Sequence, residues 1–283
     1  MPRASAWVWL LTVVAFCVSG PLWSVELRLL EPAHSVRPGE VLEWEVRDIP
    51  SEWLQHEVTE TPYLIITEAD GRSYRRNSFL IRPFRIDRQQ RQGEFMATGD
   101  ATLHLRHSPR VSGAMRWTLH PPHADAADEP LAQGRLHVHA GPSVAAITAW
   151  EENHRFLQSP TGQPMSLIGV NIAWAIDHDQ DRLATMVGYL DRFAQRGGNH
   201  IRLWAASWFG NISSQQGKHW RLDHAWLLDE VLKAAAIREI AVTLVLDNHT
   251  DFLHNSHMPY PQDLQQRQEI FFGNGLTANY QAR

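Results

Sequence analysis

Polar and aromatic residues gather at the ends of three short apolar runs in the second half of the sequence: residues 166–171 (SLIGVN), 199–204 (NHIRLW) and 240–246 (IAVTLVL). The residues at or just beyond these ends are Asn171, Trp174, Arg202, Trp204, Asp247 and His249. Amide, guanidinium, carboxylate and imidazole groups form hydrogen bonds with hydroxyls, and an indole offers a flat stacking face. The set is therefore suited to binding a hydroxylated ring such as a pyranose.

Each of these residues also has a purely structural interpretation. An arginine inside an apolar strand needs an anionic partner, so Arg202 predicts either a functional carboxylate or a structural salt bridge. His249 could line a binding site, or it could lie behind the site and form hydrogen bonds with the residues that line it. Trp204, Trp208 and Phe209 could stack on a sugar or pack in the core, and core packing suits Trp204 better than Trp208.

Three groupings have the residue types of a metal site. His137 and His139 (LHVHA) lie on one face of a predicted strand, at the spacing of a chelate, although a solvated strand face is the favoured interpretation. The histidine-rich segment 249–257 matches no zinc-binding helix pattern. The aspartate-rich segment 177–181 (DHDQD) lacks the glycine and distal glutamate of a calcium loop. We therefore predict no metal and no cofactor.

Strands and helices alternate in the half that carries the polar strand ends. Apolar residues of segment 182–196 recur at helical spacing, Gly197-Gly198 suits a helix end, and Asp223 can cap a second helix. Three strands alternating with two helices predict parallel βαβ units. A glycine-rich phosphate loop after the first strand would favour an open doubly wound sheet. Since none is present, a barrel is the better prediction.

The first half reads as short strands separated by turns such as Arg37-Pro38-Gly39. The predicted strands are 25–30, 41–46, 63–67, 78–84, 101–107, 114–120 and 134–140. Strands of this length and spacing predict a β-sandwich. We assign it to residues 25–141 and the α/β region to residues 142–283.

The N-terminus has the features of a secretory signal. Arg3 precedes an apolar run over residues 6–18, which is shorter than the ~20 residues needed to span a bilayer. Residues 1–24 are thus the predicted signal peptide, which makes the protein secreted or periplasmic and free of the membrane after cleavage. The only cysteine, Cys17, lies within it. A net charge of −5 provides no basic surface for nucleic acid.

Several phrases of the sequence resemble a known enzyme family. Segment 155–174 (RFLQSPTGQPMSLIGVNIAW) resembles the entry to the catalytic barrel of cellulase-like, family-five glycoside hydrolases and mannanases. Segment 197–204 (GGNHIRLW) resembles their second strand and 245–249 (VLDNH) their third. Segment 93–120 resembles the immunoglobulin-like domain of unknown function that precedes such barrels. The resemblance runs from about residue 25 to the end.

This resemblance implies retaining hydrolysis of a β-linked polysaccharide such as a glucan or mannan, without a cofactor. Arg202 would hold the nucleophilic carboxylate, while Asn171, Trp174, Trp204 and His249 would shape the sugar subsite. The family's two catalytic glutamates follow strands four and seven, and no position of this sequence matches either. We therefore expect a β-sandwich followed by an incomplete (β/α)8 TIM barrel, inactive alone. The alternatives are a non-catalytic carbohydrate-binding or scaffold protein, or an enzyme that uses Asp247 and Asp251 or the histidines.

Overall fold

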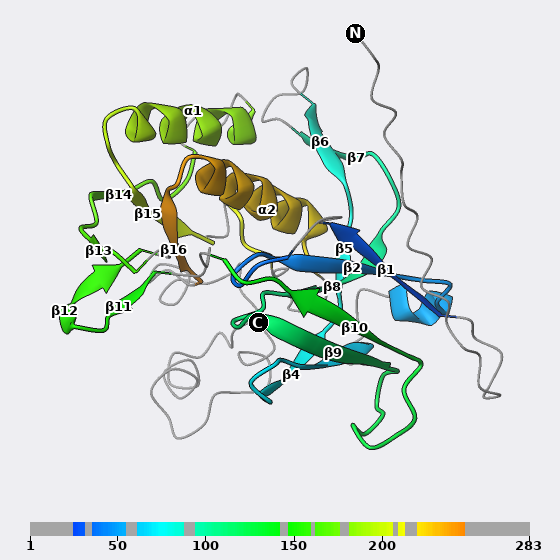
Figure 1. Ribbon diagram of the computed structural model, residues 1–283. Helices are drawn as coiled ribbons and strands as arrows, with labels where there is room; N and C mark the ends of the chain where they lie inside the picture. The colour runs from blue at the N-terminus through cyan, green and yellow to red at the C-terminus, as the bar shows by residue number, and fades with distance from the viewer. Residues whose placement is uncertain are drawn as a thin grey trace, which may run out of the picture.

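The computed structural model describes residues 25–31, 36–54, 61–87, 94–141, 147–159, 162–175, 181–205, 209–212 and 220–246 (Figure 1). Two four-stranded antiparallel sheets occupy the first half of the chain. The first sheet has the order β1-β2-β8-β5, formed by Glu26–Glu31, Leu42–Arg47, Thr102–His107 and Phe79–Ile81. The second has the order β10-β9-β3-β4, formed by Ala132–Val138, Gly113–His120, Tyr63–Thr67 and Ser73–Asn77.

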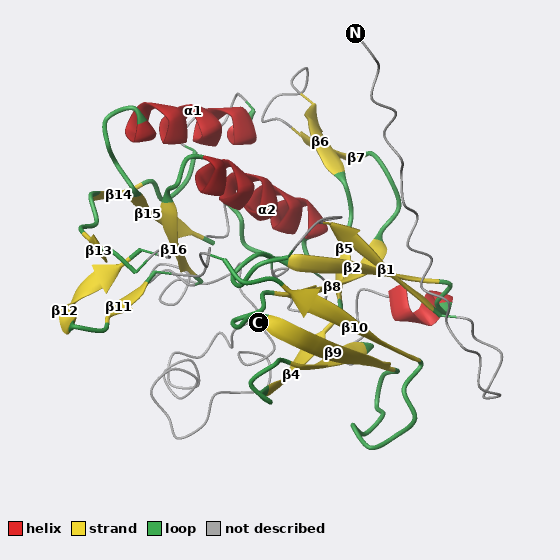
Figure 2. Cartoon of the chain, in the orientation of Figure 1, coloured by secondary structure: helices red, strands yellow, loops and turns green. Residues whose placement is uncertain are grey.

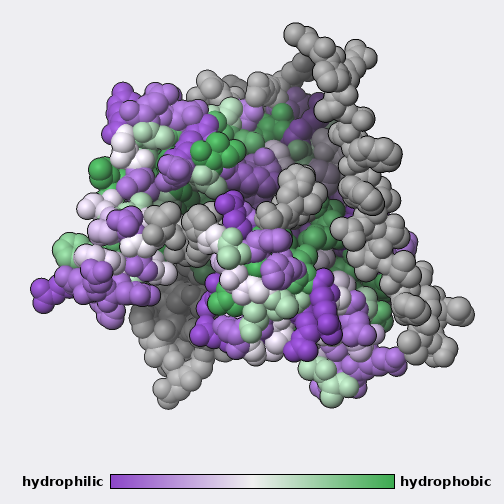
Figure 3. Space-filling model, in the orientation of Figure 1, coloured by the Kyte–Doolittle hydropathy of each residue, from purple (hydrophilic) through white to green (hydrophobic). Residues whose placement is uncertain are grey.

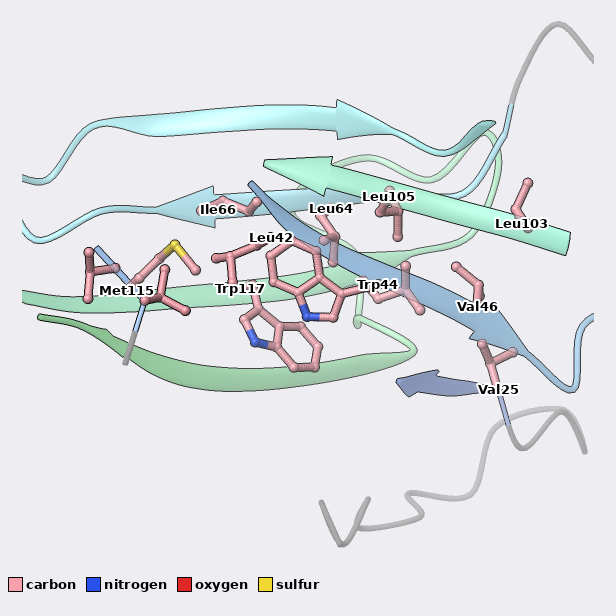
Figure 4. Close-up of a cluster of buried hydrophobic side chains, with 13 residues drawn as sticks. Val25, Leu42, Trp44, Val46, Leu64, Ile66, Leu103, Leu105, Met115 and Trp117 are labelled. Atoms are coloured by element: carbon pink, nitrogen blue, oxygen red, sulfur yellow. The ribbon is translucent and has the colours of Figure 1, made fainter. Parts of the chain in front are cut away.

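One apolar core lies between these two sheets (Figure 4). Strand β2 alternates buried and half-buried residues, which places Leu42, Trp44 and Val46 on its inner face. Strand β3 of the second sheet contributes Leu64 and Ile66, both fully buried. Inward side chains from both sheets thus interdigitate in the manner of a two-layer β structure.

Shorter elements extend from this two-sheet region. A hairpin joins β6 (Phe84–Asp87) and β7 (Glu94–Ala97). A second small antiparallel sheet combines β11 (Thr148–Trp150), β12 (Asn153–Gln158) and β13 (Pro164–Met165). A single 3-10 turn, η1 (Ser51–Leu54), follows β2.

The remaining described elements form a small α/β unit. Strands β14 (Gly169–Asn171), β15 (His200–Trp204) and β16 (Ala241–Val245) are parallel neighbours, connected by α1 (Arg182–Ala194) and α2 (Leu222–Ile237). Asp181 caps α1 by accepting a hydrogen bond from the Ala184 amide at 3.0 Å. Hydrophilic residues gather over α1 on the face shown in Figure 3, as expected for a helix that buries one stripe.

The predicted fold class, a β-sandwich followed by an incomplete (β/α)8 TIM barrel, is wrong. Among the described residues, strands in small and mostly antiparallel sheets dominate (Figure 2), and only two α-helices occur besides the 3-10 turn η1. A barrel of this kind needs eight parallel strands closed on themselves within a ring of helices. Here three short parallel strands form an open sheet, and α1 and α2 pack together against one of its faces.

Charged and aromatic contacts connect the two-sheet region to the α/β unit. The Arg106 guanidinium of β8 donates to both carboxylate oxygens of Asp229 on α2, at 3.0 and 2.8 Å, and to Glu43 of β2 at 2.7 Å. Beside this junction, Phe84 and Phe95 of the β6–β7 hairpin contact Trp226 of α2. The antiparallel sheets thereby hold α2, and through α2 the strands that carry the candidate site.

The proposed division at residues 141 and 142 stays a prediction, as do the signal peptide and export. Residues 1–24 lie outside the described part of the chain. Within that part, neither helix has the length and apolar character that crossing a membrane requires.

Candidate functional site

The candidate site lies on the face of the parallel sheet that the helices leave open. Ile201 and Leu203 of β15 are fully buried and belong to the core formed with α1 and α2. Because successive side chains of a strand point to opposite faces, Arg202 and Trp204 lie on the other face. Arg202 is exposed there and Trp204 is half-buried.

The strand register aligns three polar residues across this open face. Asn171 of β14 is the partner of Arg202, and Arg202 is the partner of Thr243 on β16. Asn171, Arg202 and Thr243 are all exposed. An amide, a guanidinium and a hydroxyl in one row give the sheet several hydrogen-bond donors and acceptors near the carboxyl ends of its strands, where open α/β sheets bind ligands.

Two tryptophans lie together just beyond that row. The rings of Trp174 and Trp204 have centroids 5.5 Å apart and planes inclined by 57°. The Trp204 amide donates to the Ala173 carbonyl at 3.0 Å, which fixes the segment after β14 beside the end of β15. The Trp204 indole Nε1 is buried and finds no acceptor among the described residues. A ligand hydroxyl or a water molecule that reached it would remove a cost of about 1–3 kcal/mol.

Trp174 and Trp204 also pack at the edge of the core. Trp174 is half-buried and contacts the buried cluster formed by α1, α2 and β15. The packing and stacking interpretations of these residues are therefore compatible, since an indole can have one side in the core and the other toward a ligand. Phe209, in contrast, is 1% exposed and is a core residue.

The surroundings of Arg202 differ from those that the sequence predicted. The prediction of an anionic partner assumed a buried arginine, whereas its side chain is exposed and has no ion pair with any residue that the structure describes. Its role toward a carboxylate stays a prediction. Asp247 and His249 lie outside the described residues, as do Trp208, the whole 249–257 segment and residues 177–180.

Sequence reasoning missed His200, at the amino end of β15. Its Nε2 lies 2.8 Å from the Thr243 hydroxyl, so a hydrogen bond crosses from β15 to β16 on the open face. The ring also covers Gly169, where an added Cβ would lie only 2.6 Å from His200 Nδ1. The spacing of His200 and Arg202 could have placed both on one face, but only the register brings Thr243 and Gly169 to His200.

Two titratable groups in the elements that support the site, Glu43 and His224, have shifted pKa values. Burial acts to raise the pKa of Glu43, but hydrogen bonds from His104 and Arg106 outweigh burial and lower this pKa to about 2. Burial lowers the pKa of His224 to about 4, and the nearby Arg221 adds to this effect. His224 is therefore neutral near pH 7, and its Nδ1 donates to the Asn211 carbonyl at 2.9 Å.

No family model matches this sequence, and no curated protein matches it. Among solved structures, the chain is similar to part of a provisionally assigned glycoside hydrolase from Bacteroides vulgatus, with 14% identity and a TM-score of 0.49. That alignment covers 75% of this chain and 41% of the Bacteroides protein.

Two further solved structures have lower similarity. For the β-glucuronidase of Parabacteroides merdae the identity is 10%, the coverage 82% of this chain and 26% of that chain, and the TM-score 0.23. For a purple acid phosphatase from yellow lupin (Lupinus luteus) seeds the identity is 7%, the coverage 80% of this chain and 35% of that chain, and the TM-score 0.22. This chain therefore spans less than half the length of each of the three structures. At these values the likenesses establish neither a fold nor a function.

Proposed function

We propose that this chain belongs to a secreted glycoside hydrolase that acts on a β-linked polysaccharide, and that the open face of its parallel sheet binds sugar. The observation that carries the proposal is the Trp174–Trp204 pair, which lies beside the exposed row of Asn171 and Arg202. Aromatic surface next to a few aligned polar groups is a common composition for a ligand site.

Each residue has a distinct part in the proposed binding. The indoles of Trp174 and Trp204 provide apolar area for the C–H face of a pyranose. Asn171 and Thr243 exchange hydrogen bonds with ring hydroxyls, and the rigid fork of Arg202 donates to a hydroxyl or to a neighbouring carboxylate. The predicted contributions of Asp247 and His249 belong to the same proposal.

Binding and hydrolysis are separate parts of this proposal. Retaining hydrolysis requires two carboxylates about 5 Å apart, one as acid and base and the other as nucleophile. The retaining mechanism and the choice between glucan and mannan rest on the sequence resemblance alone. Because no position of the sequence matches either catalytic glutamate, we expect residues 25–283 to bind oligosaccharide without cleaving it.

The experiment that tests the proposal is calorimetric titration of residues 25–283 with cellohexaose and, separately, with mannohexaose. We expect one of them to bind, and Arg202→Ala to weaken binding about 10- to 100-fold, since a hydrogen bond from a charged group contributes about 1.5–3 kcal/mol. The matched control is Arg155→Ala, which removes an exposed arginine from β12, outside the open face. Equal affinities of wild type and Arg202→Ala would contradict the site.

A second variant tests the stacking face without removing the aromatic packing. Trp204→Phe retains a ring but loses the indole N–H and part of the stacking area. We expect about tenfold weaker binding with an unchanged circular dichroism spectrum. Reducing-sugar release from either polysaccharide by residues 25–283 would contradict the expectation of binding without turnover, although it would support the glycoside hydrolase class.

A further inference from the structure

His137 and His139 lie together on the second sheet, away from the sugar site. The two rings have centroids 5.0 Å apart and are nearly perpendicular, at 85°. Both residues are exposed, while Val138 between them is buried in the core between the two sheets. His137 therefore lies on the outer face of β10, with His139 two residues further along on the same side. Strand β10 is at the edge of its sheet, beside β9 (Figure 1).

The separation of the rings is compatible with a shared metal ion. A histidine nitrogen binds a metal such as zinc at about 2.0–2.1 Å, which puts the ion roughly 3.2 Å from the imidazole centroid. For angles between about 90° and 109° at the ion, two imidazoles then have centroids about 4.5–5.2 Å apart. The 5.0 Å separation lies within this range.

Five other histidines of the described strands and helices have a hydrogen-bonding partner, whereas the exposed His154 of β12, like the pair, has none that the structure describes. His104 and His107 contact carboxylates, His120 and His200 contact threonine hydroxyls, and His224 contacts a backbone carbonyl. The backbone amide of His139 donates to the Val36 carbonyl at 2.7 Å, but the imidazoles of His137 and His139 form no hydrogen bond with the side chains or backbone that the structure describes, and their one ring contact is with each other. Both imidazoles are therefore available as ligands.

The surface beside the pair leaves room for an ion and its waters. The cross-strand partner of His137 is Ala114 of β9, whose side chain is a single methyl group. No group of three or more histidine, cysteine or acidic side chains forms a metal site within the described residues. A metal held by His137 and His139 would thus retain at least two positions for water or another ligand.

We propose that His137 and His139 chelate a divalent late first-row transition metal, with Cu²⁺ preferred over Zn²⁺. Imidazole suits both ions, and affinity at a given site follows an order that peaks at Cu²⁺. This site departs from the sequence prediction of no metal. Spacing alone places both histidines on one strand face, and the 5.0 Å between their rings adds that the two imidazoles are close enough to share one ion.

The test uses the full chain and Cu²⁺, read by NMR because the chain has 16 histidines and bulk binding would not locate the site. Paramagnetic Cu²⁺ broadens nearby amide signals. With substoichiometric Cu²⁺ we expect loss of the Ala114 and Val138 signals in the wild type. His137→Gln and His139→Gln should each require at least tenfold more Cu²⁺ for the same broadening.

The matched control is His154→Gln, which removes an exposed histidine of β12 and should leave the broadening at Ala114 and Val138 unchanged. Two outcomes would overturn the proposal. One is the absence of broadening at these two amides at a tenfold excess of Cu²⁺. The other is a single variant, His137→Gln or His139→Gln, that binds as the wild type does, because one imidazole would then suffice. The spectra themselves report that each variant is folded.

Discussion

The two-sheet region and the α/β unit bury their apolar residues in different ways. In the two-sheet region, both sheets face one shared core, so each sheet has an inner face that is fully covered. In the α/β unit, α1 and α2 cover one face of the parallel sheet, and the other face carries exposed Asn171, Arg202 and Thr243. The first arrangement provides a stable platform, and the second provides an accessible surface.

This difference separates stability from binding along the chain. The buried residues of the two sheets are mostly apolar, with His104, His107 and His120 among the exceptions. The polar groups of the parallel sheet instead form an exposed row across its three strands. Arg106 connects the two regions, because it reaches from β8 to Asp229 on α2. We therefore expect changes in the two-sheet core to affect folding of the chain, and changes on the open face to affect binding alone.

The largest expected effect comes from the core of the two-sheet region. Trp44→Ala removes a side chain that is 2% exposed and lies in the centre of that core. Loss of a buried tryptophan costs about 3–5 kcal/mol through lost transfer free energy and the cavity that remains. Urea unfolding measures this change in free energy. The control is Val41→Ala, at a residue 56% exposed, for which we expect a change within about 0.5 kcal/mol.

Most strands of the two-sheet region could be predicted from the sequence, because each has a local apolar pattern. The prediction for residues 63–67 coincides with β3, and those for 101–107 and 114–120 differ from β8 and β9 by one residue. Strand β4 was missed since its sequence, SYRRN, has no apolar alternation. The predicted strand 78–84 is two strands, divided by Arg82-Pro83, because proline cannot continue the ladder.

The fold class of the second half could not be predicted in the same way. Helix α1 and strands β15 and β16 have clear periodic patterns, and the predicted ranges agree with them to within two residues. Closure into a barrel, however, depends on strand number and stagger across the whole sheet, which no local pattern encodes. The row of Asn171, Arg202 and Thr243 likewise depends on strand register. The positions of the strand ends in the sequence therefore suggested Asn171 and Arg202 but not Thr243.

Acid stability should reveal the junction between the two regions. The pKa of Glu43 is lowered to about 2 in the folded chain, so the stability that its ionised form contributes is complete above pH ~4.5 and is lost as pH falls toward 2. Between pH 6 and pH 3 this loss is about 2 kcal/mol. We expect Glu43→Gln to reduce the loss of unfolding free energy over that range by this amount.

The matched variant for this test is Glu45→Gln. It lies on the same strand, and its carboxylate pairs with Arg47 rather than with the junction. Urea unfolding at pH 6 and pH 3 measures all three chains. If Glu43→Gln showed the same acid dependence as the wild type and Glu45→Gln, the Arg106 junction would not be the origin of the effect.

The α/β unit should respond at a higher pH, through His224. Burial lowers the pKa of this histidine to about 4, so its neutral form stabilises the fold above the unfolded pKa of ~6.5, and this contribution is lost as pH falls toward 4. Between pH 7 and pH 5 the loss is about 2 kcal/mol. His224→Gln cannot gain a proton, and we expect it to show a correspondingly smaller change in unfolding free energy.

His107 and His120 of the two-sheet region also have lowered pKa values, mainly through burial, and contribute to the same pH range. The difference in pH dependence of the unfolding free energy between wild type and His224→Gln therefore gives the contribution of the α/β unit alone. His154→Gln is the control, because it changes an exposed histidine and should leave the pH dependence as in the wild type. An unchanged slope in His224→Gln would show that the unit tolerates the buried charge.

The last comparison concerns helix packing in the α/β unit, where two glycines should respond with opposite signs and the gain at Gly188 is the smallest of the expected effects. Gly188 lies within α1, and an added Cβ would make an ordinary contact with Arg192 at 3.6 Å. Gly188→Ala should therefore stabilise the chain by about 0.5–1 kcal/mol, because alanine loses less backbone freedom on folding. At Gly198 an added Cβ would lie 2.2 Å from the Phe193 ring, so Gly198→Ala should destabilise it by about 1–3 kcal/mol. Thermal unfolding distinguishes the two signs, and destabilisation by Gly188→Ala would mean that α1 packs more tightly than this contact indicates.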